Sequence, residues 1–220
     1  MTIDRPADAG LSAAVLAGGA SRRMGVDKAL LRLAGKTLLQ RAISAVSEAA
    51  DDVRVIGDRE EYHHFGVPVE PDLYPGTGPL GGIATALRRA RHKHVLVVAC
   101  DMPFLSVELM TAMAAVPRGY HALVPVTDTP RSSHGGERTY ETLHAIYRTS
   151  CVDLIELRIA SGQLKAFEML AEMVVHELPE GWLRRYDPEL SSLVNANDPD
   201  EWLAATARLG DNLTTVEDRE

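Results

Sequence analysis

The sequence predicts a single α/β domain in which helices cover both faces of a mostly parallel, Rossmann-like sheet, giving three layers. Short apolar runs of strand length alternate with segments of helical periodicity along most of the chain. The run at 95–99, Val-Leu-Val-Val-Ala, is apolar at every position, which is typical of a central strand covered on both faces. A length of 220 residues suits one domain with a sizeable core.

The alternation is clearest in the first half of the chain. Strands are predicted at 12–17, 52–56, 67–69 and 95–99, and helices at 37–50, 79–91 and 106–116. In the first helix, Leu39, Ile43 and Val46 fall on one face. Ser106 is the predicted N-cap of the third helix, with Glu108 in its first turn.

The second half continues the pattern after one interruption. Strands are predicted at 121–126, 142–147 and 174–178, and helices at 151–160, 165–173 and 199–209. The polar segment 127–141 predicts a mobile surface loop, either a tolerated insertion or a flap over a substrate. Because residues 1–10 and 211–220 are polar and aperiodic, we expect flexible termini around a domain spanning 11–210.

Composition excludes several classes of protein. The formal net charge of -8 argues against general nucleic-acid binding, which needs a basic face. No apolar run approaches the roughly 20 residues that cross a bilayer, so no membrane partner is expected. With only Cys100 and Cys151 and no secretory leader, the chain is expected in the reducing cytoplasm.

A basic, glycine-rich loop follows the first predicted strand. The stretch at 16–31 reads LAGGASRRMGVDKALL, and Gly18 and Gly19 allow the backbone to approach a ligand closely. Positive charge and hydrogen-bond donors come from Ser21, Arg22, Arg23 and Lys28. This pattern favours a cradle for a nucleoside triphosphate, and a solvated basic turn is the alternative.

Two familiar phosphate-binding motifs do not fit this loop. A P-loop would need a glycine where Leu30 stands, ahead of Gly35-Lys36-Thr37. A dinucleotide fingerprint would need spaced glycines, whereas Gly18 and Gly19 are adjacent.

Two further segments carry candidate ligands. Asp101 comes just after the predicted central strand, in Cys-Asp-Met-Pro at 100–103, where an open α/β sheet binds ligands. A carboxylate there suits Mg²⁺ beside phosphates, and capping the next helix is the alternative. The turn at 71–82, PDLYPGTGPLGG, offers backbone N–H groups and Asp72 to a base and ribose, or is an ordinary loop.

Other reactive side chains give weaker patterns. A metal site is conceivable from His63, His64, His92 and His94, but no cysteine or carboxylate stands at zinc-ligand spacing with them. Cys100 and Cys151 lack a neighbouring histidine and are interpreted as packing residues.

Five blocks together resemble the molybdenum cofactor guanylyltransferase family of nucleotidyltransferases. They are LAGGASRRMGVDKALLRLAGKTLL, GPLGG at 78–82, CDMP at 100–103, LHAIYR at 143–148 and VNANDPDE at 194–201. The first block is shared with cytidylyltransferases and sugar-nucleotide pyrophosphorylases. The GPLGG turn and the VNANDPDE block favour the guanylyltransferases.

The resemblance implies a nucleotidyltransferase fold, GTP and molybdopterin as substrates, Mg²⁺ as cofactor, and molybdoenzymes or their chaperones as further partners. The implied nucleotide contacts are Leu16, Ala17, Gly18, Gly19, Ser21, Lys28, Asp72, Gly78, Gly81 and Asp101. Arg23, Lys28 and Asp101 are the implied catalytic residues, with Asp101 on the metal, and Asn195 and Asn197 lie on the pterin side.

The sequence departs from the family at Gly57, where relatives often present an asparagine, so no ligand is assigned there. Other activities stay open. One is a cytidylyltransferase or sugar-phosphate nucleotidyltransferase on the same scaffold, and another is a non-catalytic GTP-binding accessory protein.

Overall fold

The computed structural model describes residues 10–18, 27–128, 138–196 and 207. Its main strands are β1 (Ser12–Leu16), β4 (Asp52–Ile56), β5 (Val69–Glu70), β6 (His94–Ala99), β7 (Ala122–Thr127), β8 (Thr139–Tyr140), β9 (His144–Arg148) and β10 (Val175–Pro179). Within these ranges they form an eight-stranded sheet in the order β10-β7-β9-β6-β1-β4-β5, with β8 beside β7. The apolar run predicted to be central is β6, which does lie in the middle.

The prediction of a mostly parallel sheet is confirmed. β1 pairs in parallel with β4 and β6, β4 with β5, and β7 with β10. β9 runs antiparallel to both β6 and β7, and β8 antiparallel to β7. Because β6 and β7 both run antiparallel to β9, they point the same way. The carboxyl ends of six strands therefore lie at one edge of the sheet: β1, β4, β5, β6, β7 and β10.

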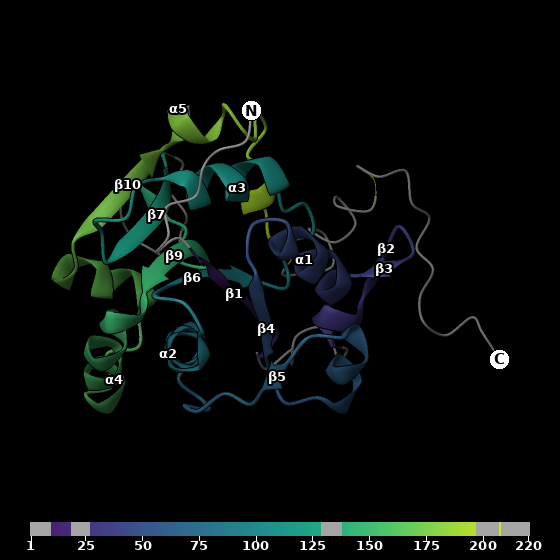
Figure 1. The fold of residues 1–220 in the computed structure, drawn as a ribbon, viewed down its shortest axis with the longest axis horizontal. Coiled ribbons are helices and arrows are strands. Elements are labelled where there is room, and N and C mark those ends of the chain that lie inside the picture. The colour runs from purple at the N-terminus through teal and green to yellow at the C-terminus, as the bar shows by residue number, and fades with distance from the viewer. Residues whose placement is uncertain (1–9, 19–26, 129–137, 197–206, 208–220) are drawn as a thin grey trace.

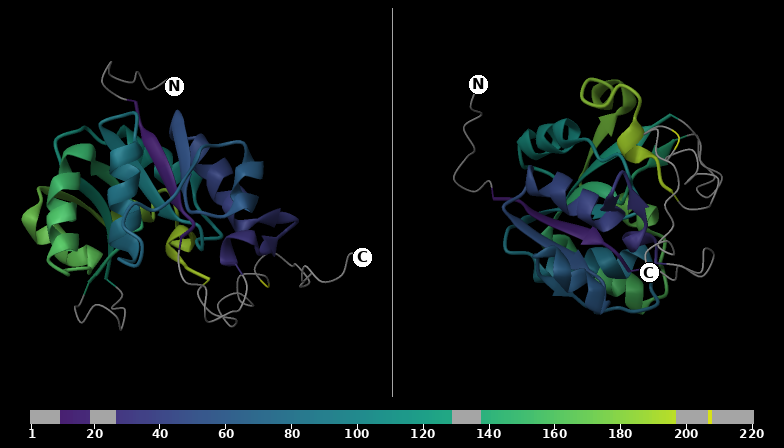
Figure 2. Two further views of the ribbon diagram at one scale, coloured as in Figure 1. Left: turned by 90° about the horizontal axis from the view of Figure 1, so that it is seen from below. Right: turned by 90° about the vertical axis from the view of Figure 1, so that its right-hand side faces the viewer.

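Helices cover both faces of the sheet, as Figures 1 and 2 show. α1 (Leu38–Ser47), α3 (Val107–Ala115) and α5 (Glu180–Leu183) pack on one face. α2 (Pro79–Arg89) and α4 (Val152–Ala160) pack on the other. The three-layer architecture predicted from the sequence is therefore confirmed.

Strand β1 explains why the apolar runs are continuous. Ala13 and Val15 point into the core under α1 and α3, whereas Ala14 and Leu16 point into the core under α2. Successive side chains of a strand alternate between faces, and here both faces are covered. The result is a strand buried at every residue.

Helix starts follow capping chemistry. Thr37 precedes α1 and forms a capping box with Gln40, in which each side chain bonds the other residue's backbone N–H. Ser106 caps α3 by accepting the N–H of Leu109 over 3.1 Å, as predicted. Pro79 begins α2, where its missing N–H costs no helical bond.

Several predicted elements differ from the structure. The segment expected as a helix at 165–173 is a 3₁₀ helix, Ala166–Glu172. A hairpin of β2 (Arg32–Leu33) and β3 (Lys36–Thr37) was not predicted. Gly35 forms its turn at φ +77°, so the Gly-Lys-Thr sequence serves a hairpin and a helix cap.

Some predictions concern residues outside the described ranges. They are the helix at 199–209, most of the loop at 127–141, and both termini. The part of that loop that is described includes β8, a short strand that the sequence did not indicate. Within the described ranges, no helix is both long and apolar enough to cross a membrane.

Candidate active site

The carboxyl ends of four neighbouring parallel strands meet at one edge of the sheet. The predicted site residues that follow β1, β5 and β6 are Ala17, Asp72 and Asp101, and Gly57 follows β4. Backbone bonds link these ends: the N–H of Ala17 donates to Ile56 over 2.9 Å, and that of Gly57 to Glu70 over 2.9 Å. The strand ends after which the sequence predicts ligand-binding residues therefore lie side by side at one edge of the sheet.

The glycine-rich loop leaves this edge directly after β1. Gly18 is exposed at its start. Residues 19–26 lie outside the described ranges, and so do the predicted ligands Gly19, Ser21 and Arg23. The chain is described again at Asp27, whose carboxylate caps the 3₁₀ helix Lys28–Leu30 by accepting the N–H of Ala29 over 3.0 Å. Lys28 thus begins a short helix at the far end of the loop.

Asp72 organises the turn ahead of α2. Its Oδ1 accepts the N–H of Tyr74 over 2.9 Å and the hydroxyl of Thr85 over 2.9 Å. Thr85 is buried in α2, so this carboxylate connects the turn to the helix. Gly78 has φ +66° immediately before the first residue of α2, a conformation that favours glycine.

The two glycines inside α2 allow close packing. A Cβ atom at Gly81 would lie 2.2 Å from Oγ1 of Thr77 and 2.7 Å from the carbonyl oxygen of Tyr74. A Cβ atom at Gly82 would lie 2.9 Å from Cδ1 of Leu16. The GPLGG sequence therefore brings the turn, the helix start and the end of β1 into contact, and Gly81 is a buried packing residue.

The segment that carries Asn195 contacts the backbone of Asp101, although 94 residues separate the two in the chain. The N–H of Ala196 donates to the carbonyl oxygen of Asp101 over 2.9 Å. The Oδ1 atom of Asn195 is buried and accepts no hydrogen bond from the described residues. The structure thus brings the residue that follows Asn195 to the backbone of the predicted metal residue, whereas Asn197 lies outside the described ranges.

These oxygens suit a hard cation. Asp101 offers a carboxylate, and Asn195 an amide oxygen that lacks a donor among the described residues. Mg²⁺ takes one or two protein oxygens and fills its other positions with water and phosphate. The described part of the chain contains no cluster of three or more His, Cys, Asp or Glu side chains that could hold a metal ion.

Sequence reasoning missed the residue that holds the segment carrying Asn195. Asp187 is buried, accepts the N–H groups of Ser191 over 3.0 Å and Ser192 over 2.8 Å, and also bonds the Ser192 hydroxyl. The sequence Asp-Pro at 187–188, with Ser191 and Ser192 shortly after it, is a turn-forming pattern that could have indicated it.

Comparisons with known proteins agree with this geometry. A model of the MobA-like NTP transferase domain matches residues 13–178, from the second residue of β1 to the fourth of β10. The chain belongs to this family.

Individual relatives extend the match. The chain is 32% identical over 196 residues to the "Probable molybdenum cofactor guanylyltransferase" of Clostridium perfringens, covering 87% of this chain and 93% of the relative. It is 29% identical, with a TM-score of 0.75, to the crystal structure of molybdopterin-guanine dinucleotide biosynthesis protein A from Archaeoglobus fulgidus, covering 90% and 98% of the two chains.

A more distant structure shares the fold alone. The 2-C-methyl-D-erythritol 4-phosphate cytidylyltransferase of Thermus thermophilus is 18% identical, with a TM-score of 0.66 over 90% of this chain and 98% of its own.

The alternative reactive centres gain no support in this MobA-like chain. His94 begins β6, at the opposite edge of the sheet, and His92 lies 2.9 Å from Asp51. Cys100 and Cys151 are both buried and form no disulfide. Burial raises the pKa of the Cys100 thiol, which disfavours a thiolate nucleophile.

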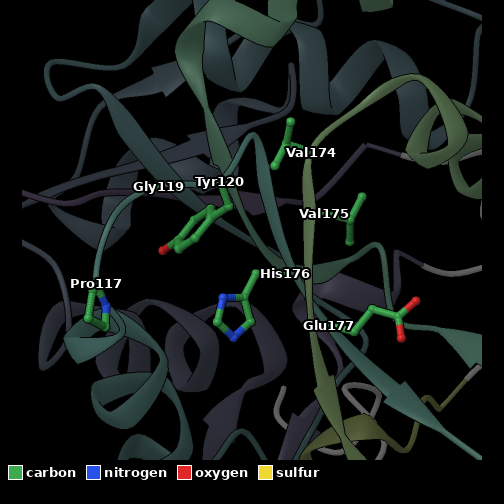
Figure 3. A pocket seen from close by; sticks show the side chains of 7 residues that line it. All are labelled: Pro117, Gly119, Tyr120, Val174, Val175, His176 and Glu177. Atoms are coloured by element: carbon green, nitrogen blue, oxygen red, sulfur yellow. The ribbon is translucent and has the colours of Figure 1, made fainter.

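A cavity of about 420 Å³ lies away from the site (Figure 3). It is lined by Pro117, Gly119, Tyr120, Val174, Val175, His176 and Glu177. These residues lie near the amino ends of β7 and β10, opposite the edge that carries Asp101. The Tyr120 and His176 rings stand edge to face with centroids 6.1 Å apart, so the cavity wall is aromatic packing.

Proposed function

We propose that the protein transfers GMP from GTP to the terminal phosphate of molybdopterin, forming molybdopterin guanine dinucleotide and releasing pyrophosphate. Membership of the MobA-like family and the names of its relatives support this activity. The observation that carries the proposal is the backbone bond from Ala196 to Asp101, which brings the segment of Asn195 to the edge where the glycine-rich loop leaves β1.

The reaction needs no catalytic base. An oxygen of the molybdopterin phosphate forms a bond to the α-phosphorus of GTP, while the bond from that phosphorus to the bridging β-phosphate oxygen breaks. A phosphate monoester has a second pKa of about 6, so this nucleophile is already largely deprotonated at neutral pH. The enzyme has to bring two anions into line and stabilise the departing pyrophosphate.

The nucleotide side is assigned to the loop and the GPLGG turn. Leu16, Ala17 and Gly18 present backbone to the guanine, and Gly19 and Ser21 lie beside the phosphates. Asp72 and Gly78 in the turn, together with Gly81 in α2, close this side. Hydrogen bonds already engage Oδ1 of Asp72, so we assign its nucleotide contact to Oδ2.

The cationic groups act on the phosphates. Arg23 and Lys28 neutralise the triphosphate, and Lys28 is held for this task at the start of a capped helix. Asp101 and Asn195 would hold Mg²⁺, which when bound supplies positive charge to the phosphate oxygens. Asn195 and Asn197 orient the pterin partner on the other side.

Two free, buried cysteines are consistent with a reducing compartment. We therefore propose that the protein works in the cytoplasm and delivers its product to molybdoenzymes or their chaperones.

A nucleotide-preference assay tests the proposal. The protein is incubated with Mg²⁺, molybdopterin and GTP, CTP, ATP or UTP in turn, and pyrophosphate release is measured. We expect GTP to be the preferred donor. A preference for CTP would indicate a cytidylyltransferase on the same fold, and GTP binding without pyrophosphate release would indicate an accessory protein.

A further inference from the structure

One buried tyrosine contacts both ends of the glycine-rich loop. Tyr62 lies in the 3₁₀ helix Glu60–Phe65 and is 1% exposed. Its hydroxyl donates to Oδ2 of Asp27 over 2.8 Å and lies 3.1 Å from the carbonyl oxygen of Ala17, as a three-centre bond. Ala17 precedes the loop and Asp27 follows it, so a single hydroxyl spans its base.

Asp27 connects Tyr62 to the helix that begins at Lys28. While Oδ2 binds Tyr62 and also lies 2.9 Å from Nε of Arg59, Oδ1 caps the helix in which Lys28 is the first residue. Burial and the neighbouring Asp27 carboxylate raise the pKa of the Tyr62 phenol, so the hydroxyl stays protonated and remains a donor.

The glycine directly after β4 packs against the same tyrosine. A Cβ atom at Gly57 would lie 2.8 Å from Cε2 of Tyr62 and 3.6 Å from Cβ of Ala17. No side chain fits between the ring and the end of β1. Glycine at position 57 therefore makes room for the tyrosine that reaches Ala17.

We propose that Tyr62 is a positioning residue for the donor nucleotide, holding Ala17 and Asp27 together so that the backbone at Ala17 and the side chain of Lys28 bind the same nucleotide. This inference rests on the proposed function, in which the loop binds GTP. Without the hydroxyl, Ala17 and Asp27 are held together less firmly. Nucleotide binding then has to supply the free energy that fixes their positions, which weakens the affinity.

Tyr62→Phe tests the inference because it keeps the ring and removes only the hydroxyl. We expect both the Kd and the KM for GTP to rise about tenfold, the usual scale for losing a hydrogen bond to a charged group. The KM for molybdopterin should stay within about twofold, since Asn195 does not contact the tyrosine. Titration calorimetry with GTP and Mg²⁺ gives the Kd, and pyrophosphate release gives both KM values.

Tyr120→Phe is the matched control. Tyr120 is also buried and its hydroxyl accepts a bond from Arg118 over 2.7 Å, but it lies at the opposite edge of the sheet. Removal of the Tyr120 hydroxyl should leave the affinity for GTP unchanged. Equal effects of the two variants on GTP would mean a general loss of stability and would overturn the inference.

A double-mutant cycle with Asp27→Asn identifies the partner. If the two side chains act through one bond, the loss of GTP affinity in the double variant will be smaller than the sum of the single losses. Additive losses, or unchanged GTP binding in Tyr62→Phe, would contradict the inference. Absence of pyrophosphate release from the unmodified protein would instead contradict the proposed function, since binding alone reports on Tyr62.

Discussion

At the scale of single residues, Asp101 is the side chain on which we expect turnover to depend most strongly. Its carbonyl oxygen accepts the N–H of Ala196 over 2.9 Å, and truncation of the carboxylate leaves this bond in place. We expect Asp101→Ala to slow pyrophosphate release from GTP by at least about 100-fold, as happens when one transition-state stabilising group is removed. Denaturant unfolding of the same preparation should stay cooperative.

Asp128→Ala is a suitable control for that experiment. Asp128 directly follows β7 at the same edge of the sheet, and its side chain is 80% exposed. Its removal should change the rate little. Near-full activity in Asp101→Ala would remove the metal assignment from this residue.

Single residues differ in how far the sequence could predict them. Asp101 was predictable because it stands just after an apolar strand that Pro103 cannot extend. Tyr62 was not, because its contact with Asp27 spans 35 residues and depends on how two loops fold over β1 and β4. The role of Gly57 was not predictable either, because it depends on the contact of this residue with the Tyr62 ring.

At the scale of elements, the start of α2 depends on Gly81. A Cβ atom there would meet Oγ1 of Thr77 and the backbone of Tyr74 at distances that require one of them to move. We expect Gly81→Ala to lower the free energy of unfolding by about 1–3 kcal/mol, the usual cost of overpacking. The KM for GTP should rise, because the displaced turn carries Asp72.

Gly181→Ala separates this effect from a general one. Gly181 lies in α5, and a Cβ atom added there meets nothing within 4 Å. The control should be as stable as the unmodified protein, since alanine favours helix more than glycine does. If Gly81→Ala unfolded at the same denaturant concentration as the control, the packing we describe for the turn would be wrong.

The elements with a clear apolar run or capping signal were predicted, and the direction of one strand and one short hairpin were not. β1, β4 and α2 begin where the apolar runs and the proline indicate. The direction of β9 was not predictable, because an apolar strand reads the same whether its neighbours run parallel or antiparallel. The β2–β3 hairpin was too short for periodicity to reveal, with two residues in each strand.

At the scale of the whole molecule, one buried histidine couples stability to pH. His144 is the first residue of β9, pairs with Val98 and is fully buried. Burial lowers the pKa of His144 to about 4, although the Ser192 backbone and the Asp187 carboxylate act in the opposite direction. An unfolded histidine has a pKa of about 6.5. Stability is therefore full above this value and falls as the pH is lowered towards 4.

Carboxylates act in a lower pH range. A hydrogen bond from Tyr140 lowers the pKa of Glu177 below its ordinary value of 4.5. A carboxylate of this kind contributes stability above its unfolded pKa and loses it as the pH falls through its folded pKa. Between pH 7 and pH 5, the change in unfolding free energy therefore reports mainly on histidine.

His144→Leu tests this coupling, because leucine fills a buried site without binding a proton. We expect the unmodified protein to lose about 2 kcal/mol of unfolding free energy between pH 7 and pH 5 on account of His144, and the variant to lose correspondingly less. Denaturant unfolding at several pH values supplies the measurement, with exposed His63→Gln as the control. Since the variant's absolute stability cancels in the comparison of slopes, parallel pH profiles would mean that His144 binds its proton equally well in the folded and unfolded chains.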